Sequence, residues 1–403
     1  MKLLFLTMVK INSLNERGIY TDLLRKFRDE GHEVYIVSPS ERREKLKTAI
    51  KEQTGVSILN VKTFNLQKTN IIEKGIGTLA MEYQYLSAIR KYFSTIKFDL
   101  VLYSTPPITF SKVISYIKKR DGAFSYLLLK DIFPQNAIDM KMMKNGSQLH
   151  KLFLKKERRL YEVSDTIGCM SEANKKFILR HNPEICNSKV EINPNTIQPI
   201  IFEESATRKA QMHAKFNIPT AAKVFIYGGN IGIPQGIDFL LETIVAAKEL
   251  PEVYFIVIGT GTEFGRISDW FKTIKPQNAS LLPGLPKNEY DQLLMACDVG
   301  LIFLNKDFTI PNFPSRLLSY LECKMPVIAA TDPNTDIGDV IENAGCGFRV
   351  ISGDMDAMLG AISGMVTNAD NFQKMRENAL LLLHDDYKVE RSYDLIVNKV
   401  GNV

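Results

Sequence analysis

Short apolar runs rich in Val, Ile and Leu alternate with stretches of helical length along the whole chain. A run that is apolar at every position is typical of a strand buried on both faces, as in a parallel sheet covered by helices. In the first half such runs predict strands at Leu3–Thr7, Val34–Ser38, Leu100–Ser104, Phe124–Leu129 and Thr166–Met170. In the second half they predict strands at Val224–Tyr227, Val253–Ile258, Val299–Leu304, Pro326–Ala330 and Gly347–Val350. The pattern therefore predicts an α/β protein.

The alternation stops in a polar, proline-containing stretch between Pro194 and Ala222 and then begins again. A chain of 403 residues also exceeds what one hydrophobic core usually serves. We therefore expect two doubly wound domains, residues 1–195 and residues 196–385. The remaining residues, 386–403, carry apolar side chains at helical spacing and predict a C-terminal helix with one apolar face: Val389, Tyr393, Ile396, Val397 and Val400.

Composition limits the classes of protein and of site. The five cysteines are scattered, with no Cys-x-x-Cys pair, so neither a disulfide framework nor a zinc site is expected. The five histidines are isolated, and no metal is expected. The apolar start of the chain ends at Lys10, far short of a signal or spanning segment, which predicts a cytoplasmic protein.

Positive charge is concentrated in residues 141–160, where seven lysines and arginines accompany Glu157 alone. The segment His150–Tyr161 mixes these cations with apolar residues at helical spacing. Such a helix can rest on an anionic bilayer, or it can simply face water. Both interpretations remain open at the level of the sequence, and no nucleic-acid partner is expected.

Two segments of the second half are typical of phosphate sites. The stretch from Asp298 to Asp332 contains a buried strand, an irregular loop, a helix that begins at Ser315–Arg316 and a second buried strand. Gly228–Gly236 is a glycine-rich loop between a strand and a helix. Backbone N–H groups at such strand ends can hold an anion. Gly259 and Gly261 also follow a strand, but their spacing and the lack of a suitable acid disfavour a nicotinamide site.

These segments together resemble the glycosyltransferase family 4 enzymes, whose fold is called GT-B. The resemblance extends to Gly31–Val34, to Asp131–Pro134 and to Ser164–Ile167 in the first half. It implies two Rossmann-like domains that face a central cleft, with the last helix crossing back to the first domain. The implied function is retaining transfer of a sugar from a UDP-sugar, without a metal or other cofactor.

The resemblance also implies the site residues. Lys306 and Arg316 would hold the diphosphate, with Asp131 and Lys130 facing them across the cleft. The implied residues around the sugar nucleotide are Gly18, Gly229, Asn230, Gly259, Gly261, Gly284, Leu285, Ser315, Arg316, Leu317 and Ser319.

The chain departs from the family pattern at charged positions. The family usually has an arginine and a lysine in the glycine loop, where this chain has Asn230 and Gln235. Pro311 and Ser319 occupy the places of two glutamates, for which Asp307 and Glu322 are candidate substitutes. Lys130 stands where many relatives have a histidine, and Arg266 is a further candidate cation.

The resemblance further implies a role in O-antigen, lipopolysaccharide or capsule biosynthesis. The donated sugar would be an N-acetylated deoxyhexose, and the acceptor an undecaprenyl-diphosphate-linked saccharide at the inner face of the plasma membrane. The oligomeric state is not predicted. Two other classes remain open: a sugar-nucleotide epimerase with the same fold, and a catalytically silent protein that binds a sugar nucleotide.

Overall fold

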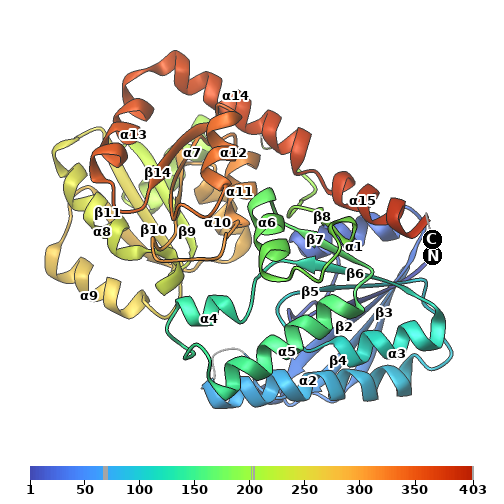
Figure 1. The fold of residues 1–403 in the computed structure, drawn as a ribbon. Helices are drawn as coiled ribbons and strands as arrows, with labels where there is room; N and C mark the ends of the chain where they lie inside the picture. The colour runs from blue at the N-terminus through green and yellow to red at the C-terminus, as the bar shows by residue number, and fades with distance from the viewer. Residues whose placement is uncertain (67–70, 201, 203–204, 402–403) are drawn as a thin grey trace. The chain divides into compact units, whose positions relative to one another are not determined.

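A computed structural model describes residues 1–66, 71–200, 202 and 205–401. The chain forms two compact units (Figure 1). The first unit comprises Met1–Gln198 together with Lys388–Val403, and the second comprises Pro199–Tyr387. Each unit is built around one sheet, and both sheets are predominantly or entirely parallel, as the apolar runs predicted.

The first unit contains an eight-stranded sheet in the order β3-β4-β2-β1-β5-β6-β7-β8. Only β3 runs antiparallel to its neighbour. Its strands are β1 (Lys2–Leu6), β2 (Glu33–Glu41), β3 (Ala49–Gln53), β4 (Val56–Thr63), β5 (Leu100–Ser104), β6 (Phe124–Leu129), β7 (Thr166–Cys169) and β8 (Val190–Ile192). Its α-helices are α1 (Ile19–Asp29), α2 (Ile71–Tyr92), α3 (Ser111–Asp121), α4 (Gln135–Asp139), α5 (Gln148–Val163), α6 (Glu172–His181) and α15 (Val389–Gly401).

The last helix, α15, packs on the first unit against α1. All five apolar residues of the predicted helical face contact the core there, with Val389 and Ile396 fully buried. The ring of Tyr393 meets that of Phe27 edge-on at 4.9 Å. The helix therefore completes the covering of this sheet.

The second unit contains six parallel strands in the order β11-β10-β9-β12-β13-β14. They are β9 (Lys223–Asn230), β10 (Val253–Thr260), β11 (Ala279–Pro283), β12 (Val299–Phe303), β13 (Val327–Thr331) and β14 (Gly347–Ile351). Its α-helices are α7 (Ala206–Lys215), α8 (Ile237–Ala246), α9 (Phe264–Ile274), α10 (Lys287–Leu294), α11 (Arg316–Glu322), α12 (Ile337–Asn343), α13 (Met355–Thr367) and α14 (Ala369–Asp386). Every residue from Val224 to Tyr227 is buried, because the sheet is covered on both faces.

Strand order places a switch point in each sheet. The chain adds β2 on one side of β1 and later β5 on the other, and it adds β10 and then β12 on the two sides of β9. In open parallel sheets, ligands bind outside the carboxyl ends of the strands at such points. The loops after β1 and β9 are therefore the places to examine for a site.

Candidate functional site

The glycine loop, Gly228–Gly236, comprises the last three residues of β9 and the turn that follows, and it contains no charged side chain. Asn230 and Gln235, at the two positions where basic residues were missing, are bonded to each other: Asn230 Nδ2 donates to Gln235 Oε1 at 2.8 Å. The Asn230 carbonyl in turn accepts a hydrogen bond from the Tyr227 hydroxyl at 2.6 Å. These two bonds hold the loop, so any cation at this switch point must come from another element.

Arg316, in the first turn of α11, supplies that cation. Its guanidinium carbon lies 4.4 Å from the centroid of the Tyr227 ring, a cation–π distance. A Cβ placed on Gly229 would lie 3.5 Å from the same carbon, so the guanidinium sits directly beside the glycine loop. The predicted association of Gly229 with Arg316 is thus present in the structure.

The guanidinium of Arg316 has unused hydrogen-bonding capacity. Its Nη1 is enclosed and has no hydrogen-bond partner among the described residues. Although burial opposes the charged form, the neighbouring tyrosines Tyr227 and Tyr320 leave the pKa of Arg316 raised. An enclosed donor without a partner is costly. An anion at this point would satisfy it.

Tyrosines surround this guanidinium on several sides. The Tyr320 hydroxyl accepts the N–H of Gly228 at 3.3 Å and lies 3.2 and 3.1 Å from the carbonyl oxygens of Ile226 and Leu301. Burial raises the pKa of Tyr320 to about 12, so the hydroxyl stays protonated. Tyr320 thus holds the carboxyl end of β9 through these backbone hydrogen bonds. Tyr227 and Tyr320 were not among the predicted site residues, although Tyr227 immediately precedes the Gly228-Gly229 pair.

Gly259 and Gly261 have a structural reason to be glycine. A Cβ on Gly259 would lie 1.8 Å from the carbonyl oxygen of Gly229, and one on Gly261 would lie 2.0 Å from that of Ile231. The missing side chains therefore let the turn after β10 approach the glycine loop. Gly284 similarly has Thr260 Cγ2 at 3.0 Å from its Cβ position, and Leu285 beside it is partly buried.

The remaining predicted residues on α11 differ in what they can offer. Ser315 is exposed and Ser319 is partly buried. Leu317 is fully buried and its N–H donates to the Pro314 carbonyl at 3.3 Å, so it offers a ligand no free donor in this structure. The buried Glu322 accepts the N–H of Ile200 at 2.7 Å and serves the scaffold.

The other two candidate cations of this unit are exposed. Arg266 pairs with Asp238 at 2.8 Å and with Glu263 at 2.7 Å, so its charge is already compensated. Lys306 follows β12, beside the switch point, and within the described chain it makes no ion pair. Its Cδ lies 3.9 Å from a Cβ placed on Gly353. Lys306 is therefore the more available of the two.

An acid that is not among the predicted site residues directly follows β13. Asp332 is fully buried; its Oδ1 accepts the N–H groups of Asn334 and Thr335, and its Oδ2 has no partner in the described part of the chain. Burial raises its pKa to about 6. Its position directly after a buried strand was the signal available in the sequence.

In the first unit, Lys130 and Asp131 follow β6. Burial lowers the pKa of Lys130 to about 7, and its Nζ lies 3.4 Å from the Asn193 carbonyl oxygen. Lys130 also lines a cavity of ≈ 10 Å³, enough for about one water. Asp131 accepts a hydrogen bond from Asn136 Nδ2 at 2.7 Å. The backbone N–H groups of Lys130 and Asp131 both donate to Thr105 Oγ1.

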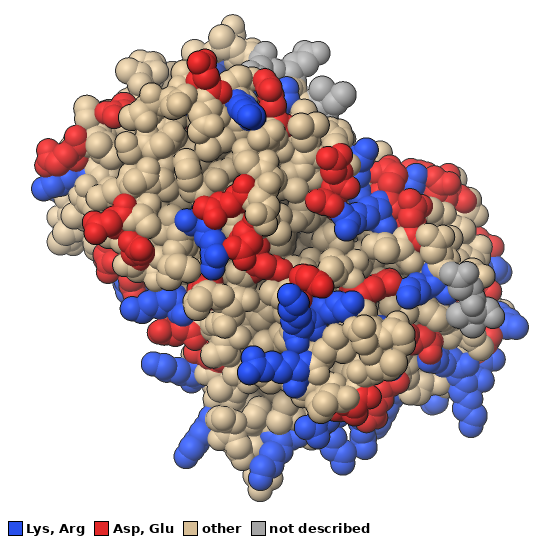
Figure 2. Space-filling model, turned by 45° about the horizontal axis from the view of Figure 1, so that its top comes forward, with Lys and Arg blue, Asp and Glu red and all other residues tan. Residues whose placement is uncertain are grey.

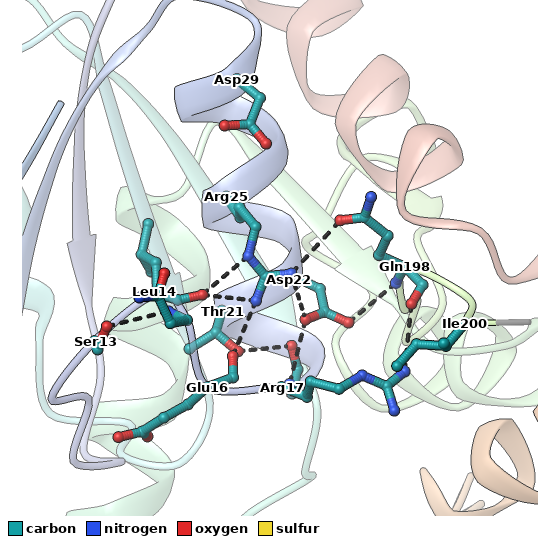
Figure 3. A network of polar contacts seen from close by, with 12 residues as sticks. Ser13, Leu14, Glu16, Arg17, Thr21, Asp22, Arg25, Asp29, Gln198 and Ile200 are labelled. Atoms are coloured by element: carbon teal, nitrogen blue, oxygen red, sulfur yellow. Dashed lines mark hydrogen bonds and ion pairs between the residues drawn. The ribbon is translucent and has the colours of Figure 1, made fainter. Parts of the chain in front are cut away.

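The loop that contains Gly18 is held by an ion pair between the buried Asp22 and the partly buried Arg25 (Figure 3). Asp22 Oδ1 accepts the Gly18 N–H at 3.3 Å and the Arg25 guanidinium at 3.2 Å, and Asp22 Oδ2 accepts the N–H of Gln198 at 3.0 Å. Arg25 also donates to the carbonyls of Leu14 and Glu16. The Gly18 N–H is therefore occupied within the chain, and the loop is tied to the end of the first unit.

Comparison with known proteins agrees with this arrangement. Residues 208–381, all within the second unit, match the family described as glycosyl transferases group 1. HepE from Anabaena, solved in complex with UDP, matches with a TM-score of 0.70 and 15% identity over 100% of both chains. The chain has the GT-B fold, and its second unit is similar to the group 1 glycosyl transferases. The family resemblance and the fold class indicated by the sequence motifs are thus confirmed.

Two further proteins are similar to this chain. The probable glycosyltransferase WbjE of Pseudomonas aeruginosa is 23% identical over 299 residues, which cover 72% of this chain and 71% of WbjE. Sucrose-phosphate synthase from Thermosynechococcus elongatus matches with a TM-score of 0.75 and 13% identity, over 100% of this chain and 98% of the synthase. Among the described residues, no group of three His, Cys, Asp or Glu side chains is placed to hold a metal ion.

Proposed function

We propose that the protein is a glycosyltransferase that takes its sugar from a UDP-sugar and binds the diphosphate at Arg316, Lys306 and the Gly229–Asn230 loop. The observation that carries the proposal is the Arg316 guanidinium, which lies beside Gly229 and whose enclosed Nη1 has no partner within the described chain. The carboxyl end of β9 is also the switch point of its sheet. Relatives of the same fold support the choice of nucleotide, since HepE was solved with UDP and with UDP-glucose.

The proposed reaction proceeds with retention at the anomeric carbon and without a metal. As the bond to the leaving diphosphate breaks, negative charge develops on its oxygens, and Arg316 and Lys306 stabilise that charge. A leaving-phosphate oxygen accepts the proton of the acceptor hydroxyl, which attacks from the same face. Lys130 and Asp131 are proposed to act on the acceptor side. Lys130, with its pKa lowered to about 7 by burial, can exchange a proton near neutral pH.

The proposed acceptor is an undecaprenyl-diphosphate-linked saccharide, and the proposed donor sugar an N-acetylated deoxyhexose, in O-antigen or capsule biosynthesis. One similar structure supports a role in surface polysaccharide, namely that of WaaG, a glycosyltransferase involved in lipopolysaccharide biosynthesis. WaaG matches with a TM-score of 0.64 and 13% identity, over 98% of this chain and 99% of WaaG.

The nucleotide proposal predicts selective stabilisation by UDP. In a metal-free buffer, millimolar UDP is expected to raise the unfolding temperature, whereas CMP, GDP and NAD are not. Millimolar ligand at a micromolar dissociation constant adds about 4 kcal/mol to stability, enough for a shift of several degrees. A folded sample that responds to none of the four nucleotides would contradict the proposed UDP site, whereas UDP binding without hydrolysis or transfer would favour the catalytically silent alternative. An isomerised sugar formed without acceptor would favour the epimerase.

We also propose that α5 rests on the cytoplasmic, inner face of the plasma membrane. Lys and Arg side chains gather along the lower edge of Figure 2. On α5, Leu149 and Leu152 are 50% and 41% exposed, and Lys151 and Lys155 are exposed beside them. Lys156 does not contribute, since it pairs with the buried Glu82 at 3.2 Å. No helix in the described chain is long and apolar enough to span a bilayer.

Charge reversal on α5 is expected to reduce binding to anionic vesicles. The double variant Lys151→Glu, Lys155→Glu should weaken co-sedimentation with phosphatidylglycerol vesicles at low salt by tenfold or more, at about 1 kcal/mol per cation. The matched control is Lys248→Glu, Lys272→Glu, which reverses two exposed lysines of the second unit. Equal sedimentation of both variants would contradict the placement of α5 on the membrane.

A further inference from the structure

Tyr290 lies over the glycine loop from an element to which no function has been assigned. It belongs to α10, and a Cβ placed on Gly228 would lie only 2.1 Å from its hydroxyl oxygen. The hydroxyl therefore rests against the bare backbone of Gly228. Any side chain at position 228 would displace it, so this position of the Tyr290 hydroxyl requires glycine at 228.

The Tyr290 hydroxyl has no hydrogen-bond partner in the described part of the chain. It differs in this respect from its neighbours, because Tyr227 donates to the Asn230 carbonyl and Tyr320 is bonded to three backbone groups. Tyr290 is partly exposed, so solvent or a ligand can reach it. Its surroundings raise its pKa, chiefly through burial, which keeps the phenol protonated as a donor.

Two unused donors thus meet at the same short backbone segment. The Arg316 guanidinium, whose Nη1 has no partner among the described residues, lies beside Gly229, and the Tyr290 hydroxyl lies over Gly228. One donor comes from α11 and the other from α10, and Arg316 also acts electrostatically on Tyr290. A phosphate has several acceptor oxygens and satisfies donors from different directions at once. A nucleoside without phosphate carries no negative charge to pair with the Arg316 guanidinium.

We propose that Tyr290 is a ligand-binding residue that donates a hydrogen bond to the diphosphate of the sugar nucleotide, together with Arg316. This inference rests on the proposed function, and it adds a neutral donor where the loop lacks the usual basic residues. In the reaction, the hydroxyl strengthens its hydrogen bond as charge develops on the leaving diphosphate. Tyr290 would then favour both binding of UDP and departure of the leaving group.

The test compares Tyr290→Phe with the wild type by calorimetric binding of UDP, inorganic pyrophosphate and uridine. Phenylalanine keeps the ring over Gly228 and removes only the hydroxyl. We expect the affinities for UDP and pyrophosphate to fall by about tenfold to a hundredfold, as for a hydrogen bond to a charged group, while that for uridine is unchanged. Tyr254→Phe is the matched control, since Tyr254 lies on β10 of the same unit, and it should bind all three as the wild type does.

Each other outcome identifies what has failed. Wild-type affinity for UDP in a folded Tyr290→Phe protein overturns the inference and leaves the proposed function standing. An equal loss for UDP and uridine also overturns it, because the hydroxyl would not act through phosphate. Absence of UDP binding by the wild type itself overturns the proposed function, and the inference with it.

Discussion

Replacing Arg316 with alanine is expected to slow sugar transfer by about 10²–10³-fold, the usual effect of removing one preorganised donor from a developing negative charge. The glycine loop itself contains no lysine or arginine that could replace Arg316, and its Asn230 and Gln235 bond to each other. The fold should persist, because the lost cation–π contact with Tyr227 is offset by removal of an enclosed, unpartnered donor. Release of UDP from a UDP-sugar in the presence of a lipid-linked acceptor measures the effect.

Three further variants separate the role of Arg316 from a general effect of charge. Arg266→Ala removes an exposed arginine that already pairs with Asp238 and Glu263, and it should leave turnover within twofold of the wild type. Lys306→Ala should lower transfer strongly as well, with an intact fold. Arg316→Lys keeps a charge but loses the planar group that stacks on Tyr227, so it should restore activity only in part. Unchanged turnover in both Arg316→Ala and Lys306→Ala would remove the diphosphate assignment.

The strands that the sequence revealed are those buried on both faces. The predicted ranges Leu100–Ser104 and Phe124–Leu129 coincide with β5 and β6, because each has a single polar residue, a serine, and lies in the middle of its sheet. The strands β3, β4, β8 and β11 were not predicted. They lie at or next to the edges of their sheets, and β3 exposes charged side chains, so no continuous apolar run marks them.

The candidate site was predictable only in the residues that follow strands. Arg316 and Gly229 were recognised from a helix opening and a glycine turn, and the structure places them together. The contributions of Tyr227, Tyr290 and Tyr320 could not be predicted, since they come from β9, α10 and α11 and meet only in the folded unit. The spacing of the glycines also did not separate ligand binding from packing. Gly259 and Gly261 lack side chains because neighbouring backbone lies where a Cβ would be.

Replacing Asp22 with alanine is expected to destabilise the first unit by about 3–5 kcal/mol, as for removal of one partner from a buried ion pair. Asp22 is 1% exposed and accepts hydrogen bonds from Gly18, Arg25 and Gln198 (Figure 3). Without it, the Arg25 guanidinium loses its carboxylate, and two backbone N–H groups lose their acceptor. Urea unfolding gives the size of the loss.

The control for Asp22→Ala is Asp29→Ala on the same helix. Asp29 is about half exposed and pairs with the neighbouring Arg28, so its removal should cost under about 0.5 kcal/mol. Hydrogen–deuterium exchange locates the effect: in Asp22→Ala, peptides from α1 and from residues 11–18 should exchange faster, while those from β9 and β10 should not. If the two variants unfold alike, the buried pair does not hold the Gly18 loop. If only Asp22→Ala loosens it, the loop after β1 owes its position to this carboxylate, since a glycine turn alone would not keep one conformation.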